Sequence, residues 1–405
     1  MKKIVLAGFP SVKNLGDPVL FESTEYLIKD VLRNVPYPIV VERLDLLGGK
    51  VGLKQLTGKI INRLYDRIGD QKERQLRSHY AIKELIYGLL LREHFEKAVK
   101  GSVAVVVAGG GLIKFKYESC DYRLIMLIKI ASKHNIPVYL NAVGIEGYSD
   151  SDLRCQELKK HLNSEVVKVI TTRDDISLLN DKYVTNTRIK TTRVADSALW
   201  SDKVYGLTKN PKSETVGLGV VRGGIFYDNG IDFSEGELLE LWVGIIRELD
   251  IRGIMWKIFT NGLEADSQFC DLLLKRLNKT KDKESLVEIP RSPSDLVRII
   301  SQFNKVLACR MHASIIAYSL NIPSVGLVWN DKIRMFGKLI GHPERFIDVG
   351  DFCPKLIVDT LLNAENGSSD EAFKSAYRQT TRNHLQAFLA SIVDVPFTVA
   401  HSEKI

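Results

Sequence analysis

Short apolar runs that end in glycine or polar residues alternate with helical patterns along most of the chain. The first run, residues 4–7, leads into Gly8 and a polar loop, then a helical pattern over about 19–32 and a second apolar run at 38–44. A strand, a glycine-bearing loop, a helix and another strand in this order begin a doubly wound parallel sheet. Further strands are predicted at 103–107, 137–142, 166–171, 189–194, 215–221, 254–259, 286–289, 306–309, 325–329 and 346–349.

The length and one polar segment divide the chain into two α/β domains. A chain of 405 residues exceeds what one hydrophobic core usually holds. The polar, proline-bearing segment 201–214 is typical of a linker. We therefore predict an α/β fold with a first Rossmann-like domain over 1–205 and a second over 213–350. Helices at 354–363 and 370–393 and a tail complete a C-terminal region, 351–405.

Residues 50–100 interrupt the first domain with a basic helical segment. This stretch has 12 Lys and Arg against 6 Asp and Glu, and 12 − 6 gives +6 of the whole chain's +8. Its leucines and isoleucines follow helical spacing, which predicts an inserted basic helical hairpin. Two interpretations remain open: solvated helices packed on the domain, or a peripheral contact with an anionic membrane surface.

Composition and missing motifs exclude several classes of protein. The five cysteines are scattered and form no CxxC pair, which favours a reducing, cytoplasmic location and no zinc site. No apolar run is long enough to span a membrane, and the first apolar run is too short for a signal peptide. The chain lacks GxGxxG after its first strand, GxxxxGK[ST], HExxH and GxSxG. We therefore expect no nicotinamide cofactor, no metal and no nucleic-acid partner.

Cations follow two strands of the second domain at the point where each strand ends. Arg310 and His312 come directly after the run 306–309, and Arg222 follows the run 215–221. Ligands of open α/β sheets bind at this edge, and Arg suits bidentate contact with phosphate or carboxylate. A plain structural reading, in which Arg310 caps a carbonyl and His312 packs at a helix start, stays open.

Other candidate residues also lie at predicted strand exits. Asp17 is a candidate base for a hydroxyl group, or simply a helix cap. Arg173 and Asp174 are better explained as a local ion pair and cap. Candidate substrate-binding residues are Asn14, Gly16, Gly109, Gly110, Gly111, Thr260, Asn261 and Lys332.

Several of these segments together resemble the polysaccharide pyruvyl transferase family. The resemblance lies in NLGD near the N-terminus, AGGG after the third strand, TRDDIS, RMHASIIAYSLNIP and WND with its following Lys332. It extends from residue 4 to about 340 and is specific through motif order and spacing. Two features depart from it: Pro18 follows Asp17 where the family often has Glu, and 50–100 matches no motif.

The resemblance implies a fold similar to the GT-B glycosyltransferases, with an active site between the domains. It implies phosphoenolpyruvate as donor, with no other cofactor, and a sugar diol as acceptor, free or lipid-linked. The product would be a cyclic pyruvate ketal on a surface polysaccharide or its precursor. By motif, Arg222, Arg310 and His312 would hold phosphoenolpyruvate. Such chemistry needs cations, a proton donor such as His312, and a base such as Asp17.

Two other functions remain open from the sequence. A GT-B glycosyltransferase would use the same cations to bind the diphosphate of a nucleotide sugar. A non-catalytic carbohydrate-binding or membrane-binding relative would keep the fold alone, although Arg222, Arg310 and His312 argue against it.

Overall fold

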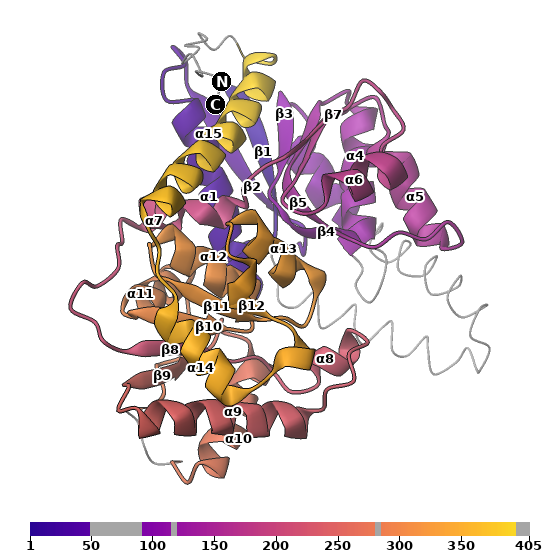
Figure 1. Cartoon of the computed structure of the whole chain (residues 1–405). Helices are drawn as coiled ribbons and strands as arrows, with labels where there is room; N and C mark the ends of the chain where they lie inside the picture. Colours follow the sequence, from indigo (N-terminus) through magenta and orange to yellow (C-terminus); the bar gives the residue numbers. More distant parts are fainter. Residues whose placement is uncertain (49–90, 115–119, 280–284, 394–405) are drawn as a thin grey trace. The chain divides into compact units, whose positions relative to one another are not determined.

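The computed structural model describes residues 1–48, 91–114, 120–279 and 285–393. The chain divides into two compact units, and each contains a parallel sheet with helices on both faces (Figure 1). The first unit is built from Met1–Ser11, Thr24–Ala195 and Thr380–Ile405, the second from Val12–Ser23 and Asp196–Gln379. The predicted fold class, α/β with two Rossmann-like domains, is confirmed.

The sheet of the first unit is parallel throughout the described residues. Its strand order is β2-β1-β3-β5-β6-β7, and β4 pairs with β5 outside this path. The strands are β1 (Lys2–Gly8), β2 (Ile39–Asp45), β3 (Ala104–Val107), β4 (Gly110–Lys114), β5 (Val138–Glu146), β6 (Val167–Thr172) and β7 (Lys190–Arg193). Its helices are a helix over 91–99, α4 (Cys120–Lys133), α5 (Leu153–Leu162), α6 (Ile176–Leu178) and a π-helical turn, Leu179–Tyr183. Helix α1 (Gly16–Val31) is shared, because its residues 24–31 belong to this unit and its earlier residues to the second.

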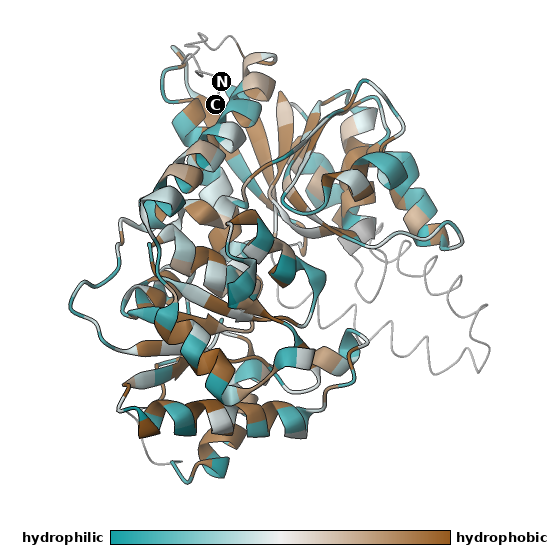
Figure 2. Cartoon of the chain, viewed as in Figure 1, coloured by the Kyte–Doolittle hydropathy of each residue, from teal (hydrophilic) through white to brown (hydrophobic). Residues whose placement is uncertain are grey.

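Helices 91–99, α4 and α5 cover one face of this sheet. Their apolar side chains form one core with alternate residues of the strands, such as Val105, Val107 and Leu140. On the other face, the Tyr139 ring stacks on Phe388 of α15 (Ser368–Ala390), with centroids 5.1 Å apart. The strands contain β-branched and other apolar residues on both faces, as a sheet buried on both sides requires (Figure 2).

The sheet of the second unit is also parallel, with the order β12-β11-β10-β8-β9. Its strands are β8 (Val216–Gly219), β9 (Trp256–Phe259), β10 (Lys305–Ala308), β11 (Ser324–Leu327) and β12 (Phe346–Ile347). Helices α9 (Glu235–Ile251), α10 (Glu264–Arg276) and α14 (Pro354–Asn363) pack on one face (Figure 1). Helices α11 (Pro293–Ser301), α12 (Met311–Ser319) and α13 (Asp331–Leu339) lie on the other. Short helices complete the unit: Ser197–Trp200, α7 (Ser201–Tyr205), α8 (Ile225–Asp228), Pro343–Arg345 and Val349–Asp351.

The division into units differs from the predicted boundaries, 1–205, 213–350 and 351–405. Residues 12–23 belong to the second unit, where the Leu15 N–H donates to the Asn261 carbonyl at 2.9 Å. Residues 196–205 also belong to the second unit, where the Asp202 N–H donates to Ser319 Oγ at 2.9 Å. Residues 351–379 join it through α14 and the Tyr318 hydroxyl, which donates to the Asp370 carbonyl. These long-range hydrogen bonds determine the boundaries of the units, and the local composition of the sequence does not indicate them.

Two predicted elements are wrong, and one falls largely outside the described residues. Residues 286–289 form no strand, only an isolated bridge between Leu286 and Ile258. The predicted linker 201–214 begins with helix α7. Of the basic segment 50–100, residues 50–90 lie outside the described part and 91–99 are helical. Among the described helices, none has both the length and the apolar character needed to cross a membrane.

Candidate active site

Polar and cationic residues gather at the carboxyl edge of the second unit's sheet. Arg222 follows β8, Thr260 and Asn261 follow β9, and Arg310 follows β10. Lys332 lies in the first turn of α13, shortly after β11. Because β8, β9, β10 and β11 are parallel neighbours, their exits lie along one edge, where ligands of open α/β sheets bind.

The junction between β10 and α12 is held rigidly. The Cys309 N–H donates to the Gly219 carbonyl at 2.9 Å, and the Trp329 indole N–H donates to the Cys309 carbonyl at 2.5 Å. Arg310 then takes the extended backbone of an N-cap residue, and α12 begins at Met311. Cys309 is fully buried in the core, and burial raises the pKa of its thiol, as is typical of a packing cysteine.

Arg310 is paired with a fully buried carboxylate, Asp266 of α10. Its Nε donates to Asp266 Oδ2 at 2.9 Å, and one terminal nitrogen donates to Oδ1 at 2.6 Å. The Asp266 side chain is 0% exposed and that of Arg310 12%. The same Oδ1 accepts the backbone N–H of Arg222 at 2.9 Å. One carboxylate therefore touches both predicted phosphoenolpyruvate arginines.

Arg222 lies in a glycine-bearing turn at the start of α8. Its guanidinium forms an ion pair with Asp228 and donates to the Gly223 carbonyl at 3.3 Å. Gly224 has a φ of 73°, which favours glycine there, whereas a Cβ on Gly223 would meet only the exposed Glu235 side chain, which could move aside. The Arg222 side chain is 35% exposed, which leaves it accessible to a ligand.

His312 is buried between a carboxylate and a glycine. Its Nε2 lies 3.7 Å from Asp196 Oδ2, and the two side chains are 8% and 6% exposed. A Cβ on Gly16 would lie 2.4 Å from His312 Nδ1. Gly16 was predicted as a substrate contact, whereas in the structure its lack of a side chain makes room for the imidazole.

Asn14, Gly16 and Asp17 lie in the same unit as His312. The sequence predicted that these three residues face His312 from the first domain. The structure corrects this placement, because residues 12–23 belong to the second unit. The Asn14 side-chain amide donates to Asp17 Oδ2 at 3.3 Å. Asp17 is half-buried in the first turn of α1. The segment is anchored by Leu15 on the Asn261 carbonyl, and so it joins the carboxyl edge of the second sheet.

Asn261 and Thr260 are both buried at the exit of β9. Thr260 Oγ1 accepts the Gly262 N–H at 3.3 Å, as in an ordinary turn. Asn261 is 1% exposed, and its Nδ2 has no hydrogen-bond partner among the described residues. A buried amide without a partner is costly, and a bound ligand or water would satisfy it.

The predicted glycines Gly109, Gly110 and Gly111 lie in the first unit. A Cβ on Gly109 would lie 2.5 Å from the Ala142 carbonyl oxygen, so this glycine allows close packing against β5. Gly110 and Gly111 begin strand β4. The structure therefore does not group them with Arg222, Arg310 and His312 in one unit.

Arg173 and Asp174 form the predicted local ion pair in the first unit. The Arg173 Nε lies 4.0 Å from Asp174 Oδ1, and both side chains are buried. The capping carboxylate belongs to the next residue, since Asp175 accepts the Ser177 N–H at 2.8 Å.

Asp266 and Asp196 were not predicted from the sequence. Asp196 follows the predicted strand 189–194, and this position at a strand exit could have marked it as a candidate site residue. Asp266 lies inside α10, 44 residues before Arg310, and only the tertiary structure joins them. Within the described residues, no three His, Cys, Asp or Glu side chains are placed to hold a metal ion.

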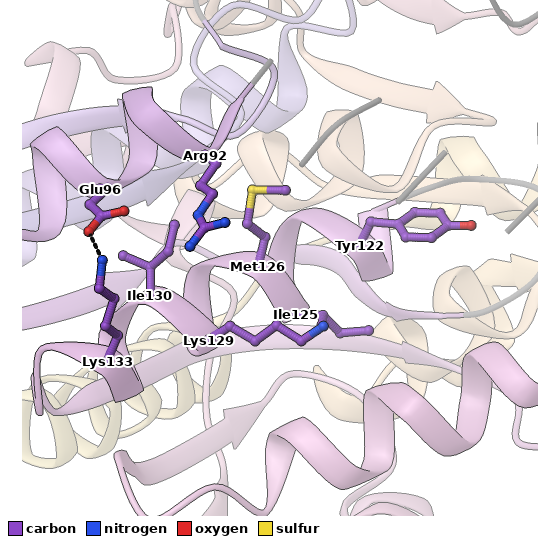
Figure 3. Close-up of a pocket in the computed structure, with 8 residues that line it drawn as sticks. All are labelled: Arg92, Glu96, Tyr122, Ile125, Met126, Lys129, Ile130 and Lys133. Atoms are coloured by element: carbon purple, nitrogen blue, oxygen red, sulfur yellow. Dashed lines mark hydrogen bonds and ion pairs between the residues drawn. The ribbon is translucent and has the colours of Figure 1, made fainter. Parts of the chain in front are cut away.

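A second candidate region is a groove in the first unit between helix 91–99 and α4 (Figure 3). Its volume is about 290 Å³. Apolar side chains meet cations there, and Glu96 pairs with Lys133. The lining residues are Arg92, Glu96, Tyr122, Ile125, Met126, Lys129, Ile130 and Lys133.

Solved structures with the same fold place the chain in a structural class. A putative UDP-N-acetylglucosamine 2-epimerase from Listeria monocytogenes has a TM-score of 0.56 at 10% identity, over 96% of each chain. MnaA from S. aureus, solved with UDP, has a TM-score of 0.55 at 12% identity, over 98% of this chain and 99% of that one. The chain therefore has a GT-B-like fold, with one parallel sheet in each of its two units.

The family follows from the sequence of the chain itself. The model of the polysaccharide pyruvyl transferase family matches residues 14–331. This range contains Asp17, Arg222, Arg310 and His312 and most of the chain. The chain belongs to the polysaccharide pyruvyl transferase family, which confirms the predicted resemblance and indicates a pyruvyl transferase. No curated protein matches the chain significantly.

Proposed function

We propose that this protein transfers the pyruvyl group of phosphoenolpyruvate to two hydroxyl groups of a sugar, forming a cyclic ketal. The product belongs to bacterial surface polysaccharide or its precursor. Membership of the family supports the pyruvyl transfer. The donor, the ketal and the acceptor are the parts that this proposal adds.

The carrying observation is the convergence of Arg310, Arg222 and Asp266 at one edge of the second sheet. Phosphoenolpyruvate has a phosphate and a carboxylate on adjacent positions of a three-carbon skeleton. Arg310 and the Arg222 segment, both fixed by Asp266, offer two cations for these two anions. Lys332, in the first turn of α13 after the same sheet edge, could add a third cation.

The reaction begins with a proton added to C3 of phosphoenolpyruvate, which makes C2 electrophilic. One sugar hydroxyl attacks C2 and loses its proton, and the C2–O bond to phosphate then breaks. The second hydroxyl attacks the resulting oxocarbenium carbon and loses its proton. The atoms balance: one phosphoenolpyruvate and one diol give one ketal and one inorganic phosphate. Positive side chains stabilise the phosphate as it departs.

His312 and Asp17 are the proposed proton carriers. His312 has an imidazole, a group that serves as a general acid or base in many enzymes, and it is held beside Gly16. Asp17 follows in the next position of the same segment, with one oxygen accepting from Asn14. We assign proton donation to His312 and removal of a hydroxyl proton to Asp17.

A GT-B glycosyltransferase is the competing function, because S. aureus MnaA of similar fold was solved with UDP. A direct test supplies the protein with phosphoenolpyruvate in one reaction and a nucleotide sugar in another, each with a galactose- or mannose-type acceptor. We expect phosphate release from phosphoenolpyruvate that depends on the acceptor. Consumption of the nucleotide sugar alone would overturn the proposal, and turnover of neither would favour a non-catalytic relative.

The acceptor can be proposed more narrowly as a sugar carried on a polyprenyl diphosphate at the inner face of the cell membrane. The groove supports this, because the partly exposed Met126 lies beside Arg92 and Lys129, over a floor formed by the buried Ile125 and Ile130 (Figure 3). A chain with an anionic head suits such a surface.

Met126→Glu tests the lipid-linked acceptor with a matched control. The variant places a charge in the groove and should lower turnover of a lipid-linked acceptor at least tenfold, while a short water-soluble acceptor is unaffected. Met255→Glu makes the same change at an exposed methionine of the second unit and should alter neither. Equal rates of Met126→Glu and wild type on the lipid-linked acceptor would contradict this narrower proposal.

A further inference from the structure

Asp266 satisfies three donors from a position with no solvent exposure. Arg310 donates through Nε and one terminal nitrogen, and the Arg222 backbone N–H shares Oδ1 with Arg310. A buried carboxylate is tolerated only when it is paired and hydrogen-bonded in this way. Asp266 thereby fixes the Arg310 side chain and the start of the Arg222 turn at the same time.

This pairing determines which edge of Arg310 can meet a ligand. The guanidinium has two edges with paired N–H groups, and Asp266 occupies the edge that includes Nε. The terminal edge, with the other terminal nitrogen, remains for an anion. A second bidentate contact is geometrically possible there, and its direction is set before a ligand arrives.

Asp196 holds His312 in a comparable way. It caps the short helix 197–200, since its Oδ1 accepts the Ala198 N–H at 2.8 Å. Its Oδ2 is directed to His312 Nε2 at 3.7 Å, which is an ion-pair distance longer than a hydrogen bond. Gly16 lies on the Nδ1 side of the ring. The carboxylate therefore faces one nitrogen, and the other faces the segment that contains Asp17.

We propose that Asp266 and Asp196 are positioning residues with separate roles. Asp266 orients Arg310 and the Arg222 turn for donor binding, and Asp196 orients His312 for proton transfer. This inference rests on the proposed function and adds two residues to it. A carboxylate behind an imidazole fixes the orientation and proton position of the ring, and a carboxylate behind a guanidinium fixes its plane.

Asp266→Asn and Asp196→Asn separate the two roles by kinetics. Each amide keeps the shape and loses the charge. We expect Asp266→Asn to raise KM for phosphoenolpyruvate at least tenfold with a smaller change in kcat. We expect Asp196→Asn to lower kcat at least tenfold with KM nearly unchanged, and to move the pH profile of kcat. Asp271→Asn, an exposed carboxylate on the same helix as Asp266, is the control and should match wild type.

Double variants test whether each carboxylate acts through its partner. Arg310→Lys loses the planar guanidinium, so adding Asp266→Asn should cost no more than threefold further in kcat/KM. His312→Ala with Asp196→Asn should behave in the same way. If Asp266→Asn does not fold, Asp266→Glu, which shifts the carboxylate by one methylene, carries the same KM prediction.

Several results overturn this inference. One is a normal KM in Asp266→Asn, and another is a normal kcat in Asp196→Asn. A third is a kcat/KM in a double variant that falls by the product of the two single losses. A fourth is an unchanged pH profile of kcat in Asp196→Asn. Either result would show that the carboxylate has a structural role only. Because wild type is measured alongside, its failure to use phosphoenolpyruvate would refute the proposed function itself and is distinguishable from all of these.

Discussion

At Gly16, the absence of a side chain decides where the His312 ring can lie. An added Cβ would stand 2.4 Å from Nδ1 and 2.5 Å from the Cβ of His312, well inside contact distance. Gly16 has no positive φ, so alanine there suffers from the clash alone. We predict that Gly16→Ala displaces His312 and lowers kcat at least tenfold. Overpacking of this kind costs about 1–3 kcal/mol of stability, which thermal denaturation would detect.

Gly236→Ala is the matched control for that substitution. Gly236 lies in the first turn of α9, and its added Cβ would approach only Ser234 Oγ, at 3.9 Å. Alanine there should leave kcat unchanged and stabilise the protein by about 0.5–1 kcal/mol. Full activity in Gly16→Ala would show that His312 does not depend on this close approach.

The same residues show what sequence could reveal about the site. Arg310 and His312 stand directly after an apolar run, so their edge position was predictable. The role of Asp266 was not predictable, because its three hydrogen-bond donors come from Arg310 and Arg222, each 44 residues away in sequence. The close approach of Gly16 to His312 was not predictable either, since nothing local in the sequence places His312 beside it.

At the level of elements, the N-terminal end of α15 is tied to α12 and to the loop before β12 through Asp370. Its Oδ2 accepts the Gly367 N–H at 2.8 Å, its Oδ1 pairs with His342 Nε2 at 2.8 Å, and its carbonyl accepts from Tyr318. Burial opposes ionisation, but these hydrogen bonds and the nearby His342 and Arg345 bring the pKa of Asp370 below its usual 3.8. A carboxyl with a lowered folded-state pKa stabilises the fold above that usual value and loses this as pH falls through the folded pKa.

We therefore predict that Asp370→Asn destabilises the protein by about 1–3 kcal/mol at neutral pH, through weakened hydrogen bonds. Between about pH 5 and pH 3, wild type should lose more unfolding free energy than the variant, because only wild type has Asp370 to protonate. Urea denaturation at several pH values measures both. Parallel losses in the two proteins would show that Asp370 does not contribute to acid sensitivity.

Most strands were predictable because, in an α/β chain, a short apolar run between glycine and polar residues usually forms a buried strand. The run 286–289 failed because only Leu286 reaches the sheet, through Ile258, and Pro290 follows at once. Helix α7 was missed because its five residues, Ser201–Tyr205, are mostly polar and resemble a linker. In both cases tertiary contacts outweighed the local pattern.

At the scale of the whole molecule, a ligand that binds only the folded chain must raise its stability. Saturation at about 100 times Kd adds about 2.7 kcal/mol. We predict that phosphoenolpyruvate raises the melting temperature of wild type and not of Arg310→Ala, because that variant removes a cation from the site and leaves the Asp266 charge without its guanidinium partner. A melting temperature equally raised in both proteins would place donor binding elsewhere.

The boundaries between units were the least predictable feature at this scale. Residues 12–23 and 380–405 belong to a different unit from the residues next to them in sequence. Their assignment depends on pairs such as Leu15 with Asn261 and Ala195 with Thr381, whose partners are far apart in sequence. The apolar periodicity of the sequence does not indicate which distant residues form such pairs.

The most direct test of pyruvyl transfer follows the carbon atom itself. Phosphoenolpyruvate labelled with ¹³C at C2 is incubated with the protein and a galactose- or mannose-type acceptor, and the products are observed by NMR. We predict that the label appears as a quaternary ketal carbon attached to the sugar, with one phosphate released per ketal, in wild type and at a rate lowered at least a hundredfold in His312→Ala. Label found only in free pyruvate, or left in phosphoenolpyruvate, would contradict the account.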